Sequence, residues 1–461
     1  MLRVFFVAVL LSCIAAQAIV AAQADPLRRL EDEAVTRVQE YLRVNTVNPP
    51  GNESRGVEFL ARLLEAEGIR YETVEPAPGR GSIWARLDGG PEPALVLLHH
   101  IDVVSADPRY WSVDPFAGVV KDGHIYGRGA LDTKGLGILH LQAFLALHRE
   151  GKPLRRPVIF MATADEEAGG AQGAGWLVQN RPELFKGVGM LLNEGGGGAE
   201  IAGRQVFEIE VTQKVPLWLR LVARDVPGHG STPRAMSSVG RIVRALERVR
   251  THQFEPRLVP AVDAYFRGRA AAGVGPFAEQ LREPAAALRR PGFLAKLQLE
   301  DPYLAAMTRN ACSITRLEGS DKINVVPPQA AAEIDCRLLP DQDVDAFVAE
   351  LRTVLGDPDI EIERIMSFAP GMSTTDTELY SAIEATTRTH FPRAAVLPAM
   401  QTGFTDSHFF RARGIPSYGY SPFLVPPEDE AGVHGNEERV SVENVRRGTR
   451  VMLEILRAMV H

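Results

Sequence analysis

Runs of apolar residues alternate with amphipathic segments along the first 200 or so positions of the chain. Residues 28–44 and 136–149 carry apolar side chains at helical spacing, and a further helix is expected at about 57–67. Strands are expected at Ser82–Leu87, Ala94–His99, Pro157–Thr163 and Met190–Asn193. Continuous apolar strands that alternate with helices are typical of a largely parallel sheet covered on both faces. The pattern therefore predicts an α/β fold.

The pattern changes near Gln213. Leu217–Ala223 alternates between apolar and polar positions, as a half-exposed strand does, and Val239–Val249 is amphipathic at helical spacing. The next expected elements are the strand pair Cys312–Leu317 and Ala331–Leu338, the helix Val344–Leu355 and the strand Ile360–Ile365. The order β-α-β-β-α-β predicts a compact α+β unit with one open sheet face.

The α/β pattern returns after about Ala369, so the α+β unit is predicted to be inserted into a discontinuous domain. We place the two parts of that domain at 25–212 and 368–461, and the inserted unit at 213–367. The stretch from Thr251 to about Tyr303 is too long for a bare loop. We expect its helices to fold over the inserted unit.

The N-terminus has a different character. An apolar run from Val4 to Ala16 follows Arg3 and precedes small residues that end at Ala24. This is the layout of a secretory signal peptide, which we place at 1–24. An uncleaved membrane anchor and a lipoprotein site at Cys13 fit the same residues less well. We therefore expect an exported protein, periplasmic or extracellular.

Composition narrows the function classes. The chain has 461 residues, of which 45% are hydrophobic and 24% charged, as in ordinary globular proteins of two or three domains. Its net charge is −7 and it has no basic block, which argues against a nucleic-acid partner. Only Cys312 and Cys336 remain after the expected cleavage, both on expected strands. One disulfide between them is an open alternative, and we favour buried free thiols.

Side chains suited to metal binding stand at the ends of the expected strands. Glu166 and Glu167 follow one strand directly, and two adjacent carboxylates repel unless a positive charge or a shared proton holds them. In open α/β sheets, ligands gather beyond the carboxyl ends of the strands. The candidate set is His100, Asp102, Asp132, Glu166, Glu167, Glu194 and His434.

This set matches the needs of two zinc ions that share one bridging carboxylate. Asp132 is the natural bridge. His100 with Glu194 would complete one ion, and Glu167 with His434 would complete the other. The sequence therefore predicts two Zn²⁺ ions per subunit, with Co²⁺ or Mn²⁺ as possible substitutes.

Two carboxylates of the set remain. Asp102 would accept the second N–H of the His100 ring and fix its tautomer. Glu166 would be the general base that takes a proton from the attacking water and passes it to the leaving nitrogen. Taken singly, a His at a strand end or a Glu-Glu pair is more often structural. Their shared placement at strand ends is what favours chemistry.

Five segments in this order resemble the motifs of one family: His100–Val103, Gly127–Gly135, Ala164–Gly170, Asn193–Gly196 and the late His434. It is the di-zinc exopeptidase family of carboxypeptidase S, glutamate carboxypeptidase, aminoacylase and acetylornithine deacetylase. The resemblance covers essentially the whole mature chain and is strongest to the carboxypeptidase S branch. It implies a zinc-exopeptidase catalytic domain with a mostly parallel sheet, into which a lid and dimerisation domain is inserted.

The resemblance also implies roles for the inserted domain. Gly228–Pro233 is similar to the lid motif whose His reaches the active site of the partner subunit and stabilises the oxyanion. His229 would have that role, which requires a homodimer formed through residues 213–367. Asn324 and Arg337 match the substrate-binding pair of the family, and Arg337 would hold a free carboxylate by a two-pronged ion pair.

One more segment of the family pattern comes late in the chain. Gly403–Ser407 is similar to the loop that lines the pocket near the substrate carboxylate, and Gly403 is the candidate contact. Phe404 stands where the family often has a second glycine, so the width of the pocket differs from the common pattern.

Together these features predict an exported zinc metallopeptidase that hydrolyses an amide bond beside a free carboxylate, a carboxypeptidase or dipeptidase. An N-acyl-amino-acid amidohydrolase is the alternative. Two other hypotheses are a non-catalytic peptide-binding relative and a serine hydrolase that uses Ser231. The intact Glu166 and five ligands argue against the first, and Ser231 lacks the Gly-x-Ser-x-Gly elbow of the second.

Overall fold

The computed structural model describes residues 25–461, and the expected signal peptide at 1–24 lies outside the described residues. Two compact units are present. The first comprises residues up to Glu92, Leu98–Glu167 and Val425–His461, and the second comprises Pro93–Leu97 and Ala168–Leu424. Within residues 25–461, no helix has both the length and the apolar character needed to cross a bilayer.

A central sheet has the strand order β1-β2-β6-β3-β7-β17-β9-β8-β18, with β16 paired to β9. The pairs β3–β7 and β7–β17 run parallel, whereas the antiparallel pairs β1–β2, β2–β6 and β8–β9 lie nearer the two ends. The strands are β1 (Tyr71–Val74), β2 (Ser82–Leu87), β3 (Ala94–His100), β6 (Val158–Thr163), β7 (Val188–Asn193), β8 (Gly198–Ile201), β9 (Arg204–Gln213), β16 (Ala395–Gln401), β17 (Ser417–Gly419) and β18 (Leu424–Val425). Every residue of β3 and β6 is buried, as their continuous apolar runs predict. The predicted α/β class is confirmed.

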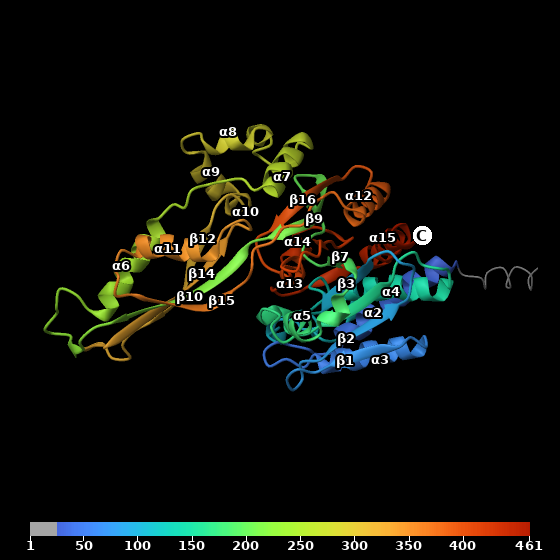
Figure 1. Cartoon of the computed structure of the whole chain (residues 1–461), viewed down its shortest axis with the longest axis horizontal. Helices are drawn as coiled ribbons and strands as arrows, with labels where there is room; N and C mark the ends of the chain where they lie inside the picture. The colour runs from blue at the N-terminus through green and yellow to red at the C-terminus, as the bar shows by residue number, and fades with distance from the viewer. Residues whose placement is uncertain (1–24) are drawn as a thin grey trace, which may run out of the picture. The chain divides into compact units, whose positions relative to one another are not determined.

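Three helices of the first unit pack against one another: α2 (Pro26–Leu42), α4 (Lys134–Glu150) and α15 (Val442–Val460) (Figure 1). The side chain of Asp25 caps α2 by accepting a hydrogen bond from the backbone N–H of Leu27 at 3.1 Å. Residues Lys134 to Leu147 of α4 are all buried, because this helix is apolar on most of its faces. A further helix, α3 (Ser54–Ala66), contacts β1 and β2.

A small sheet of the first unit joins two of its three chain segments, Leu98–Glu167 and Val425–His461. The strands β4 (Val119–Lys121), β5 (His124–Tyr126) and β19 (Arg439–Ser441) pair in the order β19-β5-β4. Arg439 lies opposite Tyr126 in this pairing. The loop after β5 is therefore held beside the loop that precedes β19, although more than 300 residues separate them in the chain.

The second unit contains the predicted inserted sheet, in the order β12-β14-β10-β15. Its elements are β10 (Val215–Arg224), α6 (Ser238–Thr251), β12 (Ala311–Glu318), β14 (Gln329–Leu338), α11 (Val344–Leu355) and β15 (Glu361–Ser367). Leu217, Leu219 and Leu221 of β10 form a core with residues of α6 and α11, which cover one face of the sheet. The predicted β-α-β-β-α-β order of the inserted part is confirmed.

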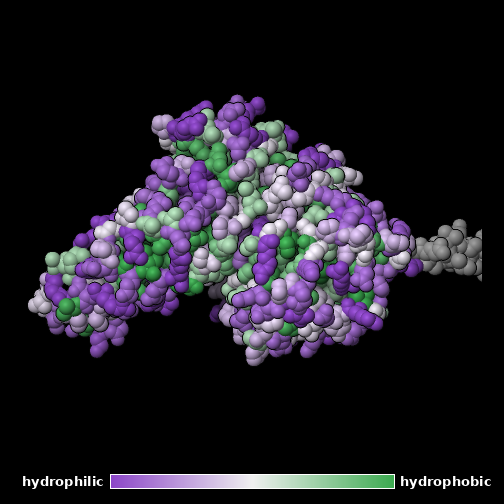
Figure 2. Space-filling view, in the orientation of Figure 1, coloured by the Kyte–Doolittle hydropathy of each residue, from purple (hydrophilic) through white to green (hydrophobic). Residues whose placement is uncertain are grey.

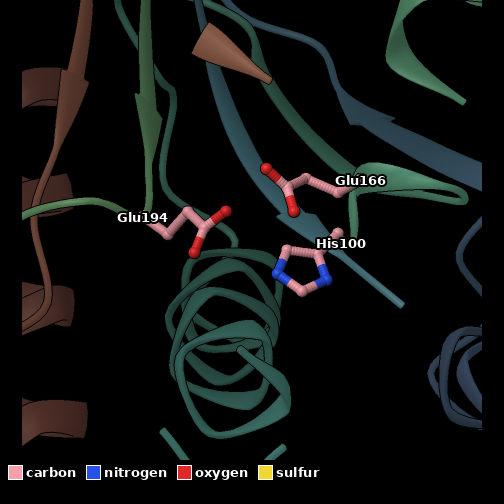
Figure 3. A group of neighbouring side chains, drawn as sticks. All are labelled: His100, Glu166 and Glu194. Carbon is pink, nitrogen blue, oxygen red and sulfur yellow. The ribbon is translucent and has the colours of Figure 1, made fainter. Parts of the chain in front are cut away.

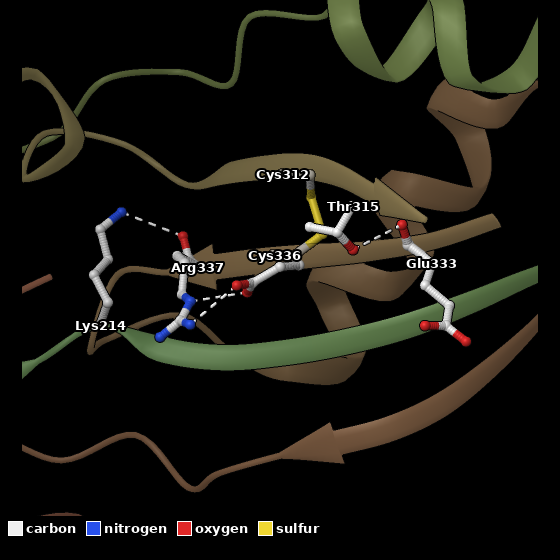
Figure 4. Close-up of a disulfide and its surroundings, with 7 residues drawn as sticks. Lys214, Cys312, Thr315, Glu333, Cys336 and Arg337 are labelled. Carbon is white, nitrogen blue, oxygen red and sulfur yellow. Dashed lines mark hydrogen bonds and ion pairs between the residues drawn. A yellow bond between two sulfur atoms is a disulfide. The ribbon is translucent and has the colours of Figure 1, made fainter. Parts of the chain in front are cut away.

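The expectation of free thiols is wrong, because Cys312 and Cys336 form a disulfide (Figure 4). The register of the antiparallel pair β12–β14 places Cys312 directly opposite Cys336. The Cα atoms lie 4.0 Å apart, close enough for a bridge to form.

The helices between Thr251 and Tyr303 do not pack where we expected. The helices α7 (Pro260–Ala271), α8 (Pro284–Leu288), α9 (Phe293–Glu300) and α10 (Pro302–Ala306) share a hydrophobic core with Leu397, Ala399 and Met400 of β16. They therefore cover the part of the central sheet that β16 and β9 form. The expectation that they fold over the α+β unit is wrong, because apolar spacing predicts a buried face and does not identify its partner.

Candidate metal centre and substrate-binding residues

The predicted metal ligands lie where strands end. His100 is the last residue of β3, Glu166 and Glu167 begin the short turn η2 (Glu166–Ala168) after β6, and Glu194 follows β7. Ligand-type atoms of His100, Glu166 and Glu194 lie within 4.8 Å of one another. Figure 3 shows the two carboxylates converging beside the His100 ring.

A second group also contains His100, together with Asp132 and Glu167. Asp132 Oδ1 is 2.9 Å from His100 Nε2, and Asp132 Oδ2 is 3.0 Å from His434 Nε2. His434 Nε2 is also 3.2 Å from Glu167 Oε2. These separations are close to those between two ligand atoms of one tetrahedral ion with bonds of about 2.0–2.1 Å. The two oxygens of Asp132 thus face different imidazoles.

The tautomer of His100 is fixed by a backbone carbonyl. Its Nδ1 lies 2.9 Å from the main-chain oxygen of Asp102 and 3.6 Å from Asp102 Oδ1. Because a carbonyl oxygen only accepts, Nδ1 carries the hydrogen and Nε2 presents a lone pair toward Asp132. Two lone pairs facing at 2.9 Å need a proton or a metal ion between them.

The carboxylate of Asp102 holds the Glu166–Glu167 turn. Its oxygens accept the backbone N–H groups of Glu166 at 3.2 Å and Glu167 at 3.1 Å, and the side-chain amide of Asn48 at 2.8 Å. Burial alone would raise the pKa of Asp102, but hydrogen bonding and the nearby His100 lower it. Asp102 therefore remains ionised and fixes the backbone from which both glutamates project. Nothing in its sequence context marked Asn48 as a partner.

Two residues of this cluster, Glu167 and His434, have strongly shifted pKa values. Burial, and then repulsion from Asp132, raise the pKa of Glu167 to about 7. Hydrogen bonds to Asp132 and Glu167 raise the pKa of His434 to about 10. Within residues 25–461, Glu167 Oε1 is buried and accepts no hydrogen bond. A cation would relieve both the repulsion and the unmet acceptor, so these residues fit a metal ion.

Sequence reasoning missed a buried ion pair that supports the centre. Arg128 Nη1 donates to Glu438 Oε2 at 2.6 Å, and neither side chain is more than 2% exposed. The carboxylate of Glu438 also accepts the backbone N–H groups of Gly129, Leu131 and Asp132 at 3.0, 2.8 and 3.1 Å. Arg128 further donates to the carbonyls of residues 432 and 435. The pair therefore joins the Asp132 loop to the His434 loop.

The residues predicted for the lid lie on a two-stranded sheet of the second unit, β11 (Gly228–His229) with β13 (Val325–Val326). His229 is exposed, and the N–H of Gly230 donates to the carbonyl of Asn324 at 2.8 Å. The ring Nδ1 of His229 accepts the backbone N–H of Ser231 at 3.1 Å. The neutral ring therefore carries its hydrogen on Nε2. The structure brings His229 and Asn324 together.

Arg337 and Gly403 belong to another part of the second unit. Arg337 lies on β14, paired with Asp335 and with its guanidinium carbon 5.5 Å from the ring centre of Phe404. In the part of the chain that the structure describes, an added Cβ at Gly403 would meet only Gln401 Cγ, at 3.9 Å. The predicted carboxylate-binding Arg and the predicted pocket loop are thus neighbours.

An α/β sheet whose strand ends gather imidazoles and carboxylates in this way is the kind of site that metal-dependent hydrolases use. The chain belongs to peptidase family M20/M25/M40, whose model matches residues 96–458. It is 30% identical over 387 residues to the N-fatty-acyl-amino acid synthase/hydrolase PM20D1 of Mus musculus, covering 80% of this chain and 75% of the relative. It is 28% identical over 441 residues to aminoacylase-1 of Sus scrofa, covering 94% of this chain and 96% of the relative.

A solved structure shares the fold. The M20 family metallo-carboxypeptidase Sso-CP2 from Sulfolobus solfataricus matches with a TM-score of 0.73 at 19% identity, covering 93% of this chain and 99% of that chain. The family resemblance seen in the sequence is confirmed, and the protein is a metallohydrolase of this family.

Proposed function

We propose that the protein is an exported di-zinc hydrolase that cleaves an amide bond beside a free carboxylate. The observation that carries this proposal is the position of Asp132, whose two oxygens face His100 and His434 at 2.9 and 3.0 Å. That arrangement suits a carboxylate that bridges two ions. His100 with Glu194 and Glu167 with His434 are the proposed remaining ligands. Zinc held there would polarise the substrate carbonyl and lower the pKa of water.

Glu166 is the proposed general base. It is buried, its atoms group with those of His100 and Glu194, and its backbone N–H is held by Asp102. It would take the proton of the attacking water and deliver it to the leaving nitrogen, a transfer that contributes about 10²–10⁴-fold to the rate.

His229 is the proposed oxyanion donor. Because Nδ1 accepts the Ser231 N–H, the outward Nε2 is a donor, which is what a developing negative charge on oxygen needs. The ring is exposed, which is consistent with a role completed by a second subunit.

A homodimer through residues 213–367 is therefore part of the proposal. Exposed apolar side chains gather on α6 and near β11–β13: Val226, Val239, Val243, Ile323 and Val325. A groove of about 430 Å³ is lined by residues of the same segments, among them Val239, Ile323 and Pro327. In Figure 2, hydrophobic green patches interrupt the hydrophilic surface over the α6–α11 region. Apolar surface of this kind suits a contact with a second copy.

Two substrate classes fit the proposed site, peptides with a free C-terminus and N-acyl amino acids. Both present an amide beside a carboxylate, and Arg337 is the proposed carboxylate ligand in either case. Two relatives by sequence are an N-fatty-acyl-amino acid synthase/hydrolase and an aminoacylase. Their names support N-acyl amino acids as the alternative substrate class. A panel of dipeptides and N-acylated amino acids, assayed by released amine, separates the two.

The test of the mechanism compares two adjacent residues. We expect Glu166→Gln to lower kcat by about 10²–10⁴-fold while metal content stays unchanged. We expect Glu167→Gln to lose metal, measured by elemental analysis after dialysis. Phenanthroline should abolish activity and zinc should restore it, whereas a serine hydrolase acting through Ser231 would resist phenanthroline and react with fluorophosphonate. A fully active Glu166→Gln enzyme would refute the proposed base.

Export and the domain division are also proposals. Asp25, the residue after the expected cleavage point, caps helix α2. The N-terminal sequence of the mature protein in a secreting host tests cleavage after Ala24. The division into 25–212, 213–367 and 368–461 predicts that limited proteolysis cuts first near residues 213 and 367.

A further inference from the structure

The guanidinium of Arg337 is held in one orientation and keeps part of its hydrogen-bonding capacity. Its Nε donates to Asp335 Oδ1 at 2.8 Å and its Nη2 donates to Asp335 Oδ2 at 3.0 Å. Within the described chain, Nη1 is buried and has no hydrogen-bond partner. Of five N–H groups, two are used by Asp335, so the end-on pair of Nη1 and Nη2 hydrogens is available for a carboxylate.

The main chain at Arg337 is fixed as well. The buried amine of Lys214 donates to the carbonyl of Arg337 at 3.2 Å (Figure 4). It also donates to the carbonyl of Arg309. The disulfide links Cys336, the residue before Arg337, to Cys312 on the neighbouring strand β12. An anion that reaches the end-on hydrogens of Arg337 therefore meets a donor whose direction is already set, which favours binding.

One face of this guanidinium lies over the ring of Phe404, which belongs to a cluster of aromatic rings. Phe404 lies under Arg337 at 5.5 Å, and Phe368 lies 5.3 Å from Phe404, edge to face. The ring of His408 stacks on Phe368 with centres 3.6 Å apart and planes at 10°. We call Phe404, Phe368 and His408 the aromatic wall. Burial lowers the pKa of His408 to about 3, so this ring is neutral near pH 7 and the wall carries no charge there.

The wall is accessible beside the cation. Phe404 and Phe368 are half-buried, whereas His408 is buried behind them. The neighbouring Gly403 contributes no side chain, and the space its Cβ would fill is open to 3.9 Å. A carboxylate bound end-on to Arg337 places the next carbon atoms of its molecule within reach of the Phe404 ring. An apolar group on those atoms would remove ring surface from water.

We propose that Phe404 determines substrate specificity, so that the residue bearing the free carboxylate is preferred when its side chain is aromatic or large and aliphatic. This inference rests on the proposed function, since it assigns the substrate class of that same carboxylate site. Glycine at this position gains nothing from the wall. A charged side chain would have to give up its hydration against neutral rings.

The experiment compares substrates that differ only in the residue bearing the carboxylate. N-acetyl-phenylalanine is compared with N-acetyl-glycine, and glycyl-phenylalanine with glycyl-glycine, each by kcat/KM with the metal-loaded enzyme. We expect the phenylalanine substrate of the pair that is hydrolysed to be preferred by about 10- to 200-fold, the range of apolar pocket discrimination. In Phe404→Ala this ratio should fall about tenfold, through KM, and Phe404→Leu should keep an intermediate ratio.

The matched control is Phe409→Leu. Phe409 belongs to the same cluster, but its ring packs against Gly170 and Gly175, where an added Cβ would lie 2.8 and 2.7 Å from it. This variant should keep the wild-type ratio even if its melting temperature falls. A wild-type ratio near 1, or a Phe404→Ala ratio equal to that of wild type, would overturn the inference. So would an equal loss on both substrates of a pair, because that is the signature of a purely structural role.

A binding measurement separates this inference from the proposed function. Calorimetric titration with 3-phenylpropionate and with propionate tests the wall without any turnover. If none of the four substrates is hydrolysed, the proposed function fails, yet 3-phenylpropionate should still bind at least tenfold tighter than propionate. Equal affinities, or an affinity ratio unchanged in Phe404→Ala, would contradict the assignment of Phe404.

Discussion

Replacement of Glu438 by Gln should weaken metal binding although Glu438 touches no proposed metal position. Its carboxylate is fully buried and accepts four hydrogen bonds, from Arg128 and from the N–H groups of Gly129, Leu131 and Asp132. A glutamine side chain has the same shape, but its NH₂ group would face donors instead of accepting from them. The Asp132 loop would have to move or leave donors unsatisfied.

The size of the effect follows from this environment. Removal of one partner of a buried pair destabilises by about 3–5 kcal/mol. Burial raises the pKa of Glu438 although Arg128 opposes the shift, so burial already disfavours the ionised side chain. We therefore use the lower end of this range of free energies. We expect a loss of about 3 kcal/mol in the unfolding free energy of the metal-free protein. Mutation of a residue that hydrogen-bonds to a metal ligand weakens metal affinity by about 10- to 100-fold. We expect a loss of zinc affinity in this range for Glu438→Gln.

Two measurements check this prediction. Zinc affinity is measured by competition with a chromogenic chelator, and the unfolding free energy by urea titration of the metal-free protein. The control is Glu437→Gln, because among residues 25–461 the side chain of Glu437 binds only the N–H and hydroxyl of Ser112 near the surface. That control should change stability by less than about 1 kcal/mol. A Glu438→Gln protein that holds zinc within twofold of wild type would refute the supporting role.

The remaining predictions concern stability. His140 is buried on α4 and burial lowers its pKa to about 3, so it opposes folding as pH falls below about 6.5, by up to about 1.4 kcal/mol per pH unit. His140→Leu should therefore reduce the loss of unfolding free energy between pH 7.5 and 5, measured by urea titration. The control is His148→Leu, an exposed position on the same helix, which should leave the pH dependence of stability unchanged. The disulfide closes a separation of 24 residues and should contribute about 3 kcal/mol; a Cys312→Ser/Cys336→Ser protein should lose that amount and become insensitive to reductant, and equal stability with and without reductant in the wild type would contradict the estimate.

The strand ends were predictable because the relevant signal is local. In β3 and β6 a continuous apolar run stops at a polar residue, so both the strand and its carboxyl end can be located from the sequence. Strands that end at the same edge of a sheet place His100 near the Glu166–Glu167 turn. In the structure, ligand-type atoms of His100 lie within 4.8 Å of those of Glu166 and of Glu167. At these positions the apolar run and the polar residues that follow it indicate the same strand end. The sequence alone was therefore enough to locate them.

Other features depend on contacts between residues far apart in the chain. Glu438 and Arg128 are 310 positions apart, and neither local sequence says that the other will be its partner. The disulfide required the β12–β14 register, which apolar alternation fixes only to within two residues. The packing of α7 on β16 was missed for a similar reason, since one apolar face fits several sheet surfaces.

To bridge two ions as proposed, Asp132 must hold its two carboxylate oxygens in fixed directions. The chain places it in a Gly-rich loop, where Gly129 adopts φ +93° and residues 127–133 belong to neither a helix nor a strand, so their N–H groups need other acceptors. Glu438 satisfies three of them from the other end of the chain. Because these hydrogen bonds involve no metal, the loop can hold its shape before an ion binds. Binding energy is then not consumed in ordering ligands, in contrast to small zinc domains whose fold is formed by the metal.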